Sequence, residues 1–264
     1  MTLSLCSFAS GSSGNCYLVK TAAGAIIIDA GISAKRILEG LARTRTKRED
    51  VRAIFVTHEH SDHIKGVRVL SKRLPNARIY ASSGTLSYLA KEVPEESLVP
   101  LVAGVSIEIE NFYVESFHIL HDAREPLGFT VSMGKKRASI VTDTGEITEE
   151  IVAAVIDSDI LVLEANHDTE ILKKGSYPYY LKQRILGAEG HLSNVQAARA
   201  LARMMRENDK KRCVLLAHLS RENNTPRLAE TEVCKILADE GFFTGRDLVV
   251  SVLERDCESP LYSI

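Results

Sequence analysis

One hexapeptide constrains this sequence more than any other feature: His58-Glu59-His60-Ser61-Asp62-His63. It directly follows the apolar run Ala53–Thr57, which predicts a buried strand, and it precedes a segment with helical periodicity. Packing in a protein core does not explain three imidazoles and a carboxylate within six residues. We therefore interpret the hexapeptide as a metal-binding loop between a strand and a helix.

The spacing of these side chains favours two metal ions over one. His58 and His60 project to the same side of an extended chain, whereas Asp62 and His63 at the helix start point elsewhere. Nitrogen and oxygen ligands together suit zinc, manganese or iron. We expect two divalent metal ions per chain, and the sequence leaves the choice of metal open.

Further polar residues stand just after apolar strands. Asp29 follows Ile26-Ile27-Ile28, His121-Asp122 follows Val114–Phe117, Asp143 follows Ser139–Thr142 and His218 follows Val214–Ala217. Strand ends gather at one edge of a sheet, where sites are commonly built. Each of these residues taken alone is equally compatible with a capped turn or a satisfied buried polar group.

The order of predicted elements gives the fold class. Each half of the sequence has several strands followed by strand–helix units, and no Pro/Gly-rich linker separates the halves. We predict an α/β (α+β) fold, a four-layer αββα sandwich forming a single domain over residues 1–264. The expected helices are Ser33–Leu41, Ile64–Leu74, Ile147–Ile156, Ser193–Arg206 and Thr225–Glu240.

Composition excludes several classes of protein. A net charge of -2 rules out binding nucleic acid through bulk positive charge, so any such contact must use local patches. The 5 cysteines contain no CxxC pair, which favours free thiols over a disulfide framework. No signal peptide or membrane-spanning apolar run is present, so we expect a cytoplasmic protein without membrane contact.

The hexapeptide and the residues that follow it resemble the HxHxDH motif and later ligands of the metallo-β-lactamase-fold hydrolase superfamily. The resemblance implies that His58, His60 and His121 bind the first metal. It also implies that Asp62, His63 and His218 bind the second, that Asp143 bridges both, and that Asp29 orients the loop from behind the ligands. His118 is an alternative to His121 as the third-motif ligand.

Several stretches are similar to the YycJ/WalJ-type bacterial subfamily: Phe8–Asn15, Leu163–Asp168, Tyr177–Ile185, Gly190–Asn194 and Ala217–Asn224. The interval from Asp143 to His218 is too short for the inserted domain of ribonuclease J-type enzymes. The interval from His121 to Asp143 is likewise too short for the arm of ribonuclease Z-type enzymes. The resemblance implies a 5′-to-3′ exonuclease acting on DNA, with mismatch-repair proteins as possible partners.

The hypothetical mechanism uses a metal-bridging hydroxide that attacks a phosphodiester. Asp62 is expected to orient that hydroxide as well as bind metal. His191, ahead of the capped helix Ser193–Arg206, is the candidate for binding phosphate or protonating the leaving oxygen, with Glu164 as its partner. His167 is a further candidate, for which catalytic, supporting and surface roles stand open.

Bases and aromatics alternate before His191, as they do in tracks for single-stranded nucleic acid. We select Tyr177, Lys182 and Arg184 as substrate-binding candidates, although solvated faces are the plainer interpretation of such runs.

Three alternatives to a DNA exonuclease stay open. The same metal pair would serve a ribonuclease, or a hydrolase of a small cyclic phosphodiester, thioester or lactone. A non-catalytic binding module is the third alternative, and the full set of ligands argues against it. The sequence does not give the oligomeric state.

Overall fold

The computed structural model describes residues 2–264, and within them the strands form two mixed sheets. In spatial order, the first sheet contains β14 (Tyr262–Ser263), β1 (Ser4–Ala9), β2 (Cys16–Lys20), β3 (Ala25–Ile28), β4 (Val51–Phe55), β5 (Arg78–Ser82) and β6 (Leu98–Leu101). The second contains β13 (Val249–Val252), β12 (Cys213–Ala217), β11 (Ile160–Glu164), β10 (Lys136–Val141), β9 (Leu127–Met133), β8 (Phe112–His118) and β7 (Ser106–Ile109).

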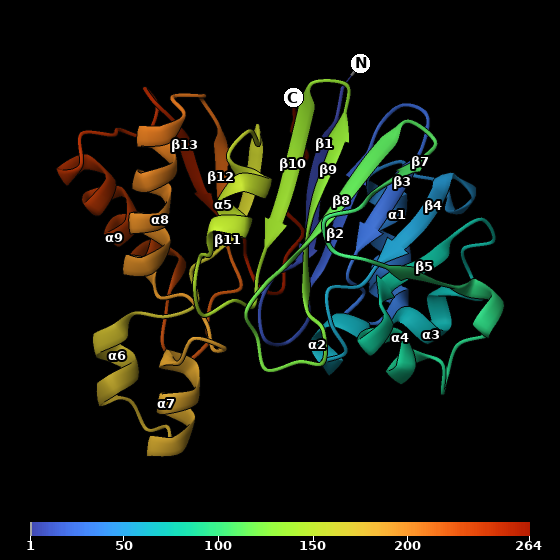
Figure 1. Ribbon diagram of the computed structural model, residues 1–264, viewed down its shortest axis with the longest axis horizontal. Coiled ribbons are helices and arrows are strands. Elements are labelled where there is room, and N and C mark those ends of the chain that lie inside the picture. Colours follow the sequence, from blue (N-terminus) through green and yellow to red (C-terminus); the bar gives the residue numbers. More distant parts are fainter. Residues whose placement is uncertain (1) are drawn as a thin grey trace.

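Helices cover the outer face of each sheet (Figure 1). Those beside the first sheet are α1 (Ala34–Arg43), α2 (Ser61–Ile64), α3 (Val67–Leu70) and α4 (Ser83–Leu89). Those on the side of the second sheet are α5 (Glu149–Val155), α6 (Thr169–Lys174), α7 (Tyr179–Leu186), α8 (Asn194–Glu207) and α9 (Pro226–Asp239). Short 3₁₀ turns span Arg48–Asp50 and Glu95–Ser97.

Three hydrophobic clusters correspond to the three interfaces of this arrangement. Phe55 and Phe129 belong to the cluster between the sheets, where their rings meet edge to face at 5.3 Å. Ile37 belongs to the cluster beneath α1, and Leu201 to the cluster beneath α8. Burial of apolar surface at all three interfaces is the main stabilising contribution. The predicted αββα sandwich is confirmed.

Parallel pairing brings the strand ends that carry polar residues to one edge. β3 pairs with β4 in parallel, and β10, β11 and β12 are successively parallel. The carboxyl ends of these strands therefore lie together, at the lower edge of the sandwich in Figure 1. This edge lies beside α2, which contains part of the histidine-rich hexapeptide.

The predicted helix Ile64–Leu74 is wrong as a single element. It is divided into α2 and α3 at Gly66, whose N–H donates to the carbonyl of Ala30 at 2.7 Å. A Cβ at Gly66 would lie 2.7 Å from the carbonyl oxygen of Ile32, so only glycine permits this close approach. Tertiary contact with the preceding loop thus overrides the helical pattern.

Helices α4, α6 and α7 were not predicted. Among them α7 contains no buried residue, so it lacks the apolar stripe by which amphipathic helices are recognised in sequence. Figure 1 shows α6 and α7 projecting below the second sheet, beside the edge where the strands end.

Candidate metal centre

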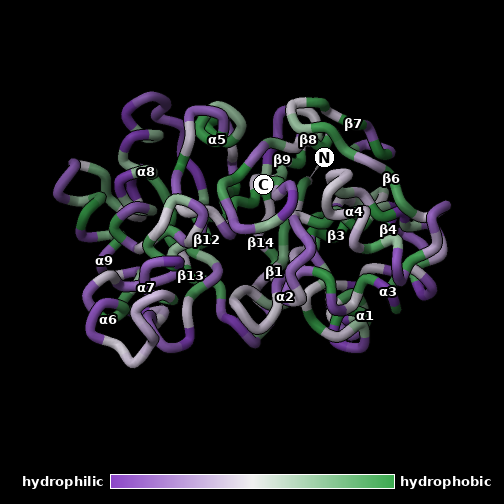
Figure 2. Tube along the Cα trace, turned by 60° about the horizontal axis from the view of Figure 1, so that its bottom comes forward, coloured by the Kyte–Doolittle hydropathy of each residue, from purple (hydrophilic) through white to green (hydrophobic). Residues whose placement is uncertain are grey.

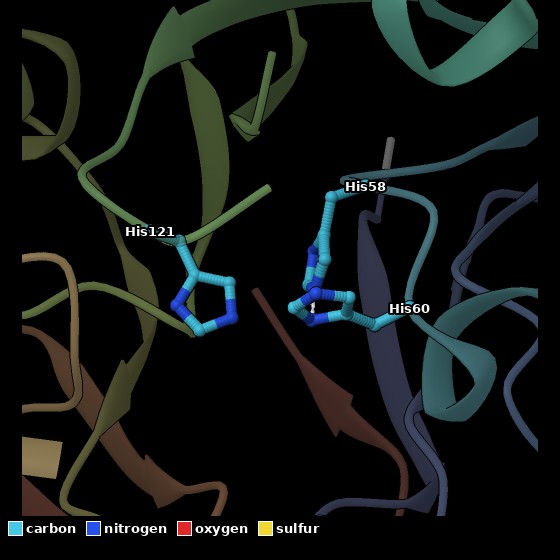
Figure 3. A group of neighbouring side chains, drawn as sticks. All are labelled: His58, His60 and His121. Atoms are coloured by element: carbon cyan, nitrogen blue, oxygen red, sulfur yellow. Dashed lines mark hydrogen bonds between the residues drawn. The ribbon is translucent and has the colours of Figure 1, made fainter. Parts of the chain in front are cut away.

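Three histidines from two loops converge at this edge (Figure 3). His58 and His60 follow β4, whereas His121 follows β8, and one ring nitrogen from each lies within 4.8 Å of the others. His58 is fully buried and His121 nearly so. Burial lowers the pKa of both side chains, and for His58 the nearby His63 adds to that effect. Low pKa values leave free lone pairs, as metal ligation requires.

A second group adjoins the first. Ligand atoms of Asp62, His63 and His218 lie within 4.8 Å of one another, and His63 and His218 are buried. Asp143 lies between the groups, because its carboxylate is 3.2 Å from Nε2 of His63 and 3.9 Å from Nε2 of His121. The structure therefore brings all seven predicted ligands to one place.

Asp29 lies behind this set and fixes the orientation of His63. Its Oδ2 is 2.7 Å from Nδ1 of His63, which leaves Nε2 facing Asp62 and Asp143. The N–H and hydroxyl of Thr57 both donate to Asp29 and hold its carboxylate. Burial acts to lower the pKa of His63, but Asp29 and Asp143 outweigh it and hold that pKa well above its usual range.

His191 and His218 share a buried carboxylate partner. Glu164, at the end of β11, places Oε1 2.9 Å from Nδ1 of His191 and 2.7 Å from Nδ1 of His218. Its Oε2 accepts from the backbone N–H groups of Thr144 and Leu192. Burial would raise the pKa of Glu164, but His191 and His218 outweigh it and bring that pKa to about 2.

The backbone at three of these positions is left-handed. The φ angles are +58° at Asp29, +59° at Asp143 and +55° at His218; Asp29 and His218 directly follow β3 and β12, and Asp143 is the second residue after β10. Non-glycine residues adopt this region at a cost of about 1–3 kcal/mol, which surrounding contacts must offset. At His218 the N–H donates to Ser10 and the carbonyl accepts from Asn166. The turns redirect the side chains from the sheet into the cluster.

The donor set fits divalent metal ions. Oδ2 of Asp143 and Nε2 of His218 are buried and have no hydrogen-bond partner among the described residues. Burial opposes protonation of His218, but Asp143 together with Asp62 and Glu164 raises the pKa of His218 to about 10. The raised pKa of His218 reflects a negative electrostatic potential at this site. A bound metal cation would neutralise that potential in place of the proton.

The remaining predicted residues lie around this cluster. His118 is mostly exposed and contacts Glu150, so His121 is the one that joins the other histidines. His167 is fully buried, and neither of its ring nitrogens has a hydrogen-bond partner among residues 2–264. Burial lowers the pKa of His167 to about 4.

The three substrate-binding candidates lie on or next to α7. Nζ of Lys182 donates to the carbonyls of Lys173 and Gly175, so it ties α6 to α7. Arg184 pairs with Asp122, the neighbour of His121. Tyr177 is half-buried, whereas Tyr179 and Tyr180 are 78% and 74% exposed.

Sequence reasoning missed two residues of this site. Asn15 is fully buried, and its Nδ2 lies 3.1 Å from Nε2 of His63. Thr57 holds Asp29. Asn15 closes the Ser/Gly-rich segment Ser10–Asn15, but that pattern is typical of any turn and gave no indication of contact with His63.

A model of the family described as "Beta-lactamase superfamily domain" matches residues 25–219, which include the hexapeptide and His218. The chain belongs to the beta-lactamase superfamily. This membership and the clustered donors indicate that the site binds divalent metal.

Two curated proteins are similar to this sequence over most of its length. One, from Streptococcus pneumoniae, is named exodeoxyribonuclease WalJ; it is 37% identical over 97% of this chain and 96% of its own length. The other, from Bacillus anthracis, is named exodeoxyribonuclease YycJ and is 35% identical over 90% of both chains. The predicted resemblance to the YycJ/WalJ-type subfamily is confirmed.

Solved structures with low identity share the fold. YhfI from Bacillus subtilis, a metallo-beta-lactamase fold protein, has a TM-score of 0.74 at 14% identity, covering 100% of this chain and 99% of its own. Zinc-bound PqqB from Methylobacterium extorquens has a TM-score of 0.71 at 14% identity, covering 97% of this chain and 99% of its own.

Within residues 2–264, no helix combines the length and the apolar character needed to cross a bilayer.

Proposed function

We propose that this chain is a metal-dependent exodeoxyribonuclease that degrades DNA from the 5′ end. One observation carries the proposal: seven nitrogen and oxygen donors from both sheets meet in a chain that is similar over nearly its whole length to proteins named exodeoxyribonucleases. Because both sheets supply donors, we also infer that residues 1–264 act as one domain.

The proposed centre has two divalent cations. His58, His60 and His121 would hold one, Asp62, His63 and His218 the other, and Asp143 lies where it can serve both. The mixed nitrogen and oxygen donors are compatible with zinc, manganese or iron. When bound, such cations lower the pKa of water and offset the charge that develops on a phosphodiester.

Residues of the chain itself would position the reactants. The carboxylate of Asp62 is partly exposed, unlike that of Asp143, so it can orient a water molecule at the mouth of the site. Burial works against a proton on His191, but Glu164 outweighs burial and raises the pKa of His191. His191 is also the partly exposed member of its cluster. It is therefore suited to protonate the departing oxygen.

His167 fits a supporting role better than contact with substrate. Its side chain is fully buried, so a substrate at the surface of the site does not reach it. It follows Glu164 closely in the chain, and its carbonyl accepts from the N–H of Asn194 at the start of α8. We infer that it shapes the loop that follows Glu164 at the end of β11.

The exposed aromatic rings of α7 favour single-stranded DNA as the substrate. Tyr179 and Tyr180 present exposed rings on which bases can stack, while Tyr177 adjoins them. Lys182 and Arg184 fix the position of the helix through Lys173, Gly175 and Asp122. The basic–aromatic segment thus combines rings that can contact bases with side chains that hold the helix in position.

Mismatch-repair partners and a cytoplasmic location stay predictions from the family resemblance.

The test combines elemental analysis with a nuclease assay. The purified protein is expected to contain two equivalents of transition metal, and to release 5′-labelled mononucleotides from single-stranded DNA in preference to RNA. Asp143→Asn should lose metal and activity together, because it removes the negative charge and one of the two oxygens of the shared donor. Release from the 3′ end, or turnover of a thioester but not of DNA, would contradict the proposal.

A further inference from the structure

A groove lies beside the metal-binding loop, on the side away from α7. It occupies about 200 Å³ between α2–α3 and α4, and its lining includes Ser61, Ile64, Arg68, Tyr88, Leu89 and Val93. Ser61 stands between His60 and Asp62 in the chain. The groove therefore begins next to two of the proposed metal ligands.

Its main surface feature is an exposed aromatic ring. Tyr88 is 40% exposed, whereas Leu89 and Val93, which line the same groove, are almost completely buried. Nζ of Lys91 lies 5.3 Å from the centroid of the Tyr88 ring. An accessible ring in a groove with apolar lining offers a stacking surface for a nucleobase.

The charges around the groove favour an anionic ligand. Lys65 and Lys91 are exposed and form no ion pair with any residue between 2 and 264. Arg68 pairs with Glu92 at 3.6 Å, so those two charges offset one another. Two unpaired cations therefore remain beside an apolar, aromatic groove, which is complementary to a nucleotide.

Arg124 connects the groove with the donor cluster. It lies in the loop that begins at His121, and its backbone N–H donates to Glu59 of the hexapeptide at 3.0 Å. Its guanidinium donates to the hydroxyl of Ser87, the neighbour of Tyr88, at 3.0 Å. The Arg124 side chain is 55% exposed and its Nε also lies 3.9 Å from the Glu59 carboxylate, so this guanidinium lies between the candidate metal centre and the ring with its charge partly offset.

We propose that this groove is a nucleotide subsite, in which Tyr88 stacks on one base of a DNA single strand and Arg124 contacts the adjoining phosphate. The inference rests on the proposed nuclease function. In both views α2 lies between α7 and α4 (Figures 1 and 2), so DNA crossing the centre contacts Tyr179 and Tyr180 on one side and Tyr88 on the other. The two aromatic surfaces would hold consecutive parts of the substrate.

The test is a coupling measurement between Tyr88 and single bases. We would compare the wild type, Tyr88→Ala and Tyr88→Phe on 5′-labelled single strands, either intact or with one abasic residue at the first, second or third position. Tyr113→Ala is the matched control, since Tyr113 is 50% exposed and lies at the end of β8 away from His121.

Tyr88→Ala should lower kcat/KM on intact DNA about tenfold, as expected for the loss of one stacked base. At one abasic position this loss should disappear, because the base that stacks is already absent. Tyr88→Phe should recover most of the loss, and Tyr113→Ala should show none. An equal loss on intact and on every abasic substrate, or no loss at all, would overturn the subsite. A wild type that cleaves no DNA would instead overturn the function on which the subsite rests.

Discussion

Nδ1 of His218 lies 2.7 Å from Oε1 of Glu164, and the same oxygen lies 2.9 Å from Nδ1 of His191. One buried carboxylate therefore orients both a proposed metal ligand and the proposed proton donor. Its other oxygen accepts two backbone N–H groups, so the carboxylate cannot rotate without losing them. This relationship ties the position of His191 to that of the metal centre.

Replacing Glu164 by Gln should reduce kcat by at least about 100-fold, the usual contribution of a positioned general acid. The neutral amide no longer favours a proton on His191. Turnover should be measured at saturating metal, with bound metal determined in the same sample. Glu150→Gln, at the exposed partner of His118, is the control and should retain activity. Full turnover by Glu164→Gln would remove Glu164 from the mechanism.

Asp29→Asn should weaken metal binding about 10- to 100-fold, because the carboxylate that orients His63 is lost. Competition against a chromophoric chelator would measure the dissociation constant. Asp209→Asn, at an exposed carboxylate on the loop after α8, should bind metal as the wild type does. Unchanged affinity in Asp29→Asn would show that packing alone orients His63.

The choice between His118 and His121 can be checked directly by metal content. His121→Ala should lose about one equivalent of metal, because it removes a member of the three-histidine cluster. His118→Ala should keep full occupancy, since this side chain is exposed and contacts Glu150. The opposite result would place the ligand at His118 and contradict the observed arrangement.

His167 should make the metal-free protein sensitive to acid. Its pKa is about 4 in the folded chain, against about 6.5 when unfolded. The unfolded chain therefore binds more protons between these values, and the free energy of unfolding falls as the pH drops below about 6.5. The loss reaches about 2 kcal/mol at pH 5 and levels off below pH 4.

Urea unfolding of the EDTA-treated protein at pH 7, 6 and 5 would measure this effect. In His167→Phe the difference in stability between pH 7 and pH 5 should be smaller by about 2 kcal/mol, because no group titrates at that position. Identical pH dependence in the two proteins would mean that the pKa of His167 is the same in the folded and the unfolded chain.

The double variant Tyr179→Ala/Tyr180→Ala should bind single-stranded DNA at least about fivefold more weakly, because the loss of even one stacked base costs about 1–3 kcal/mol. Fluorescence anisotropy with EDTA-treated protein avoids cleavage. In this tyrosine variant the slope of log binding constant against log salt concentration should stay unchanged. In Lys173→Ala/Lys174→Ala that slope should become shallower, because contacts with phosphates are lost. Wild-type affinity in the tyrosine variant would exclude α7 as a base-stacking surface.

The sequence predicted the sandwich and the metal-binding hexapeptide, and its resemblance to the superfamily implied the other donors that the structure brings together. Apolar runs ending in Asp29, Asp143 and His218 are local patterns, and parallel strands necessarily bring their carboxyl ends to one edge. The hexapeptide after β4 could also be recognised as a metal-binding segment from the sequence, because core packing does not explain three histidines and an aspartate within six residues. Alternation and capping residues likewise predicted most of the strands and the longer helices.

Only the tertiary structure decided features that depend on contacts between distant segments. Gly66 interrupts a helical pattern because Ala30 and Ile32 lie against it, and Glu164 serves two histidines because β11 ends between their loops. The position of α7 depends on Arg184 reaching Asp122, and the position of Tyr88 beside the hexapeptide depends on the packing of α4. Such contacts are absent from a sequence pattern, since a pattern records periodicity along the chain, whereas these distances are set by how separate elements pack.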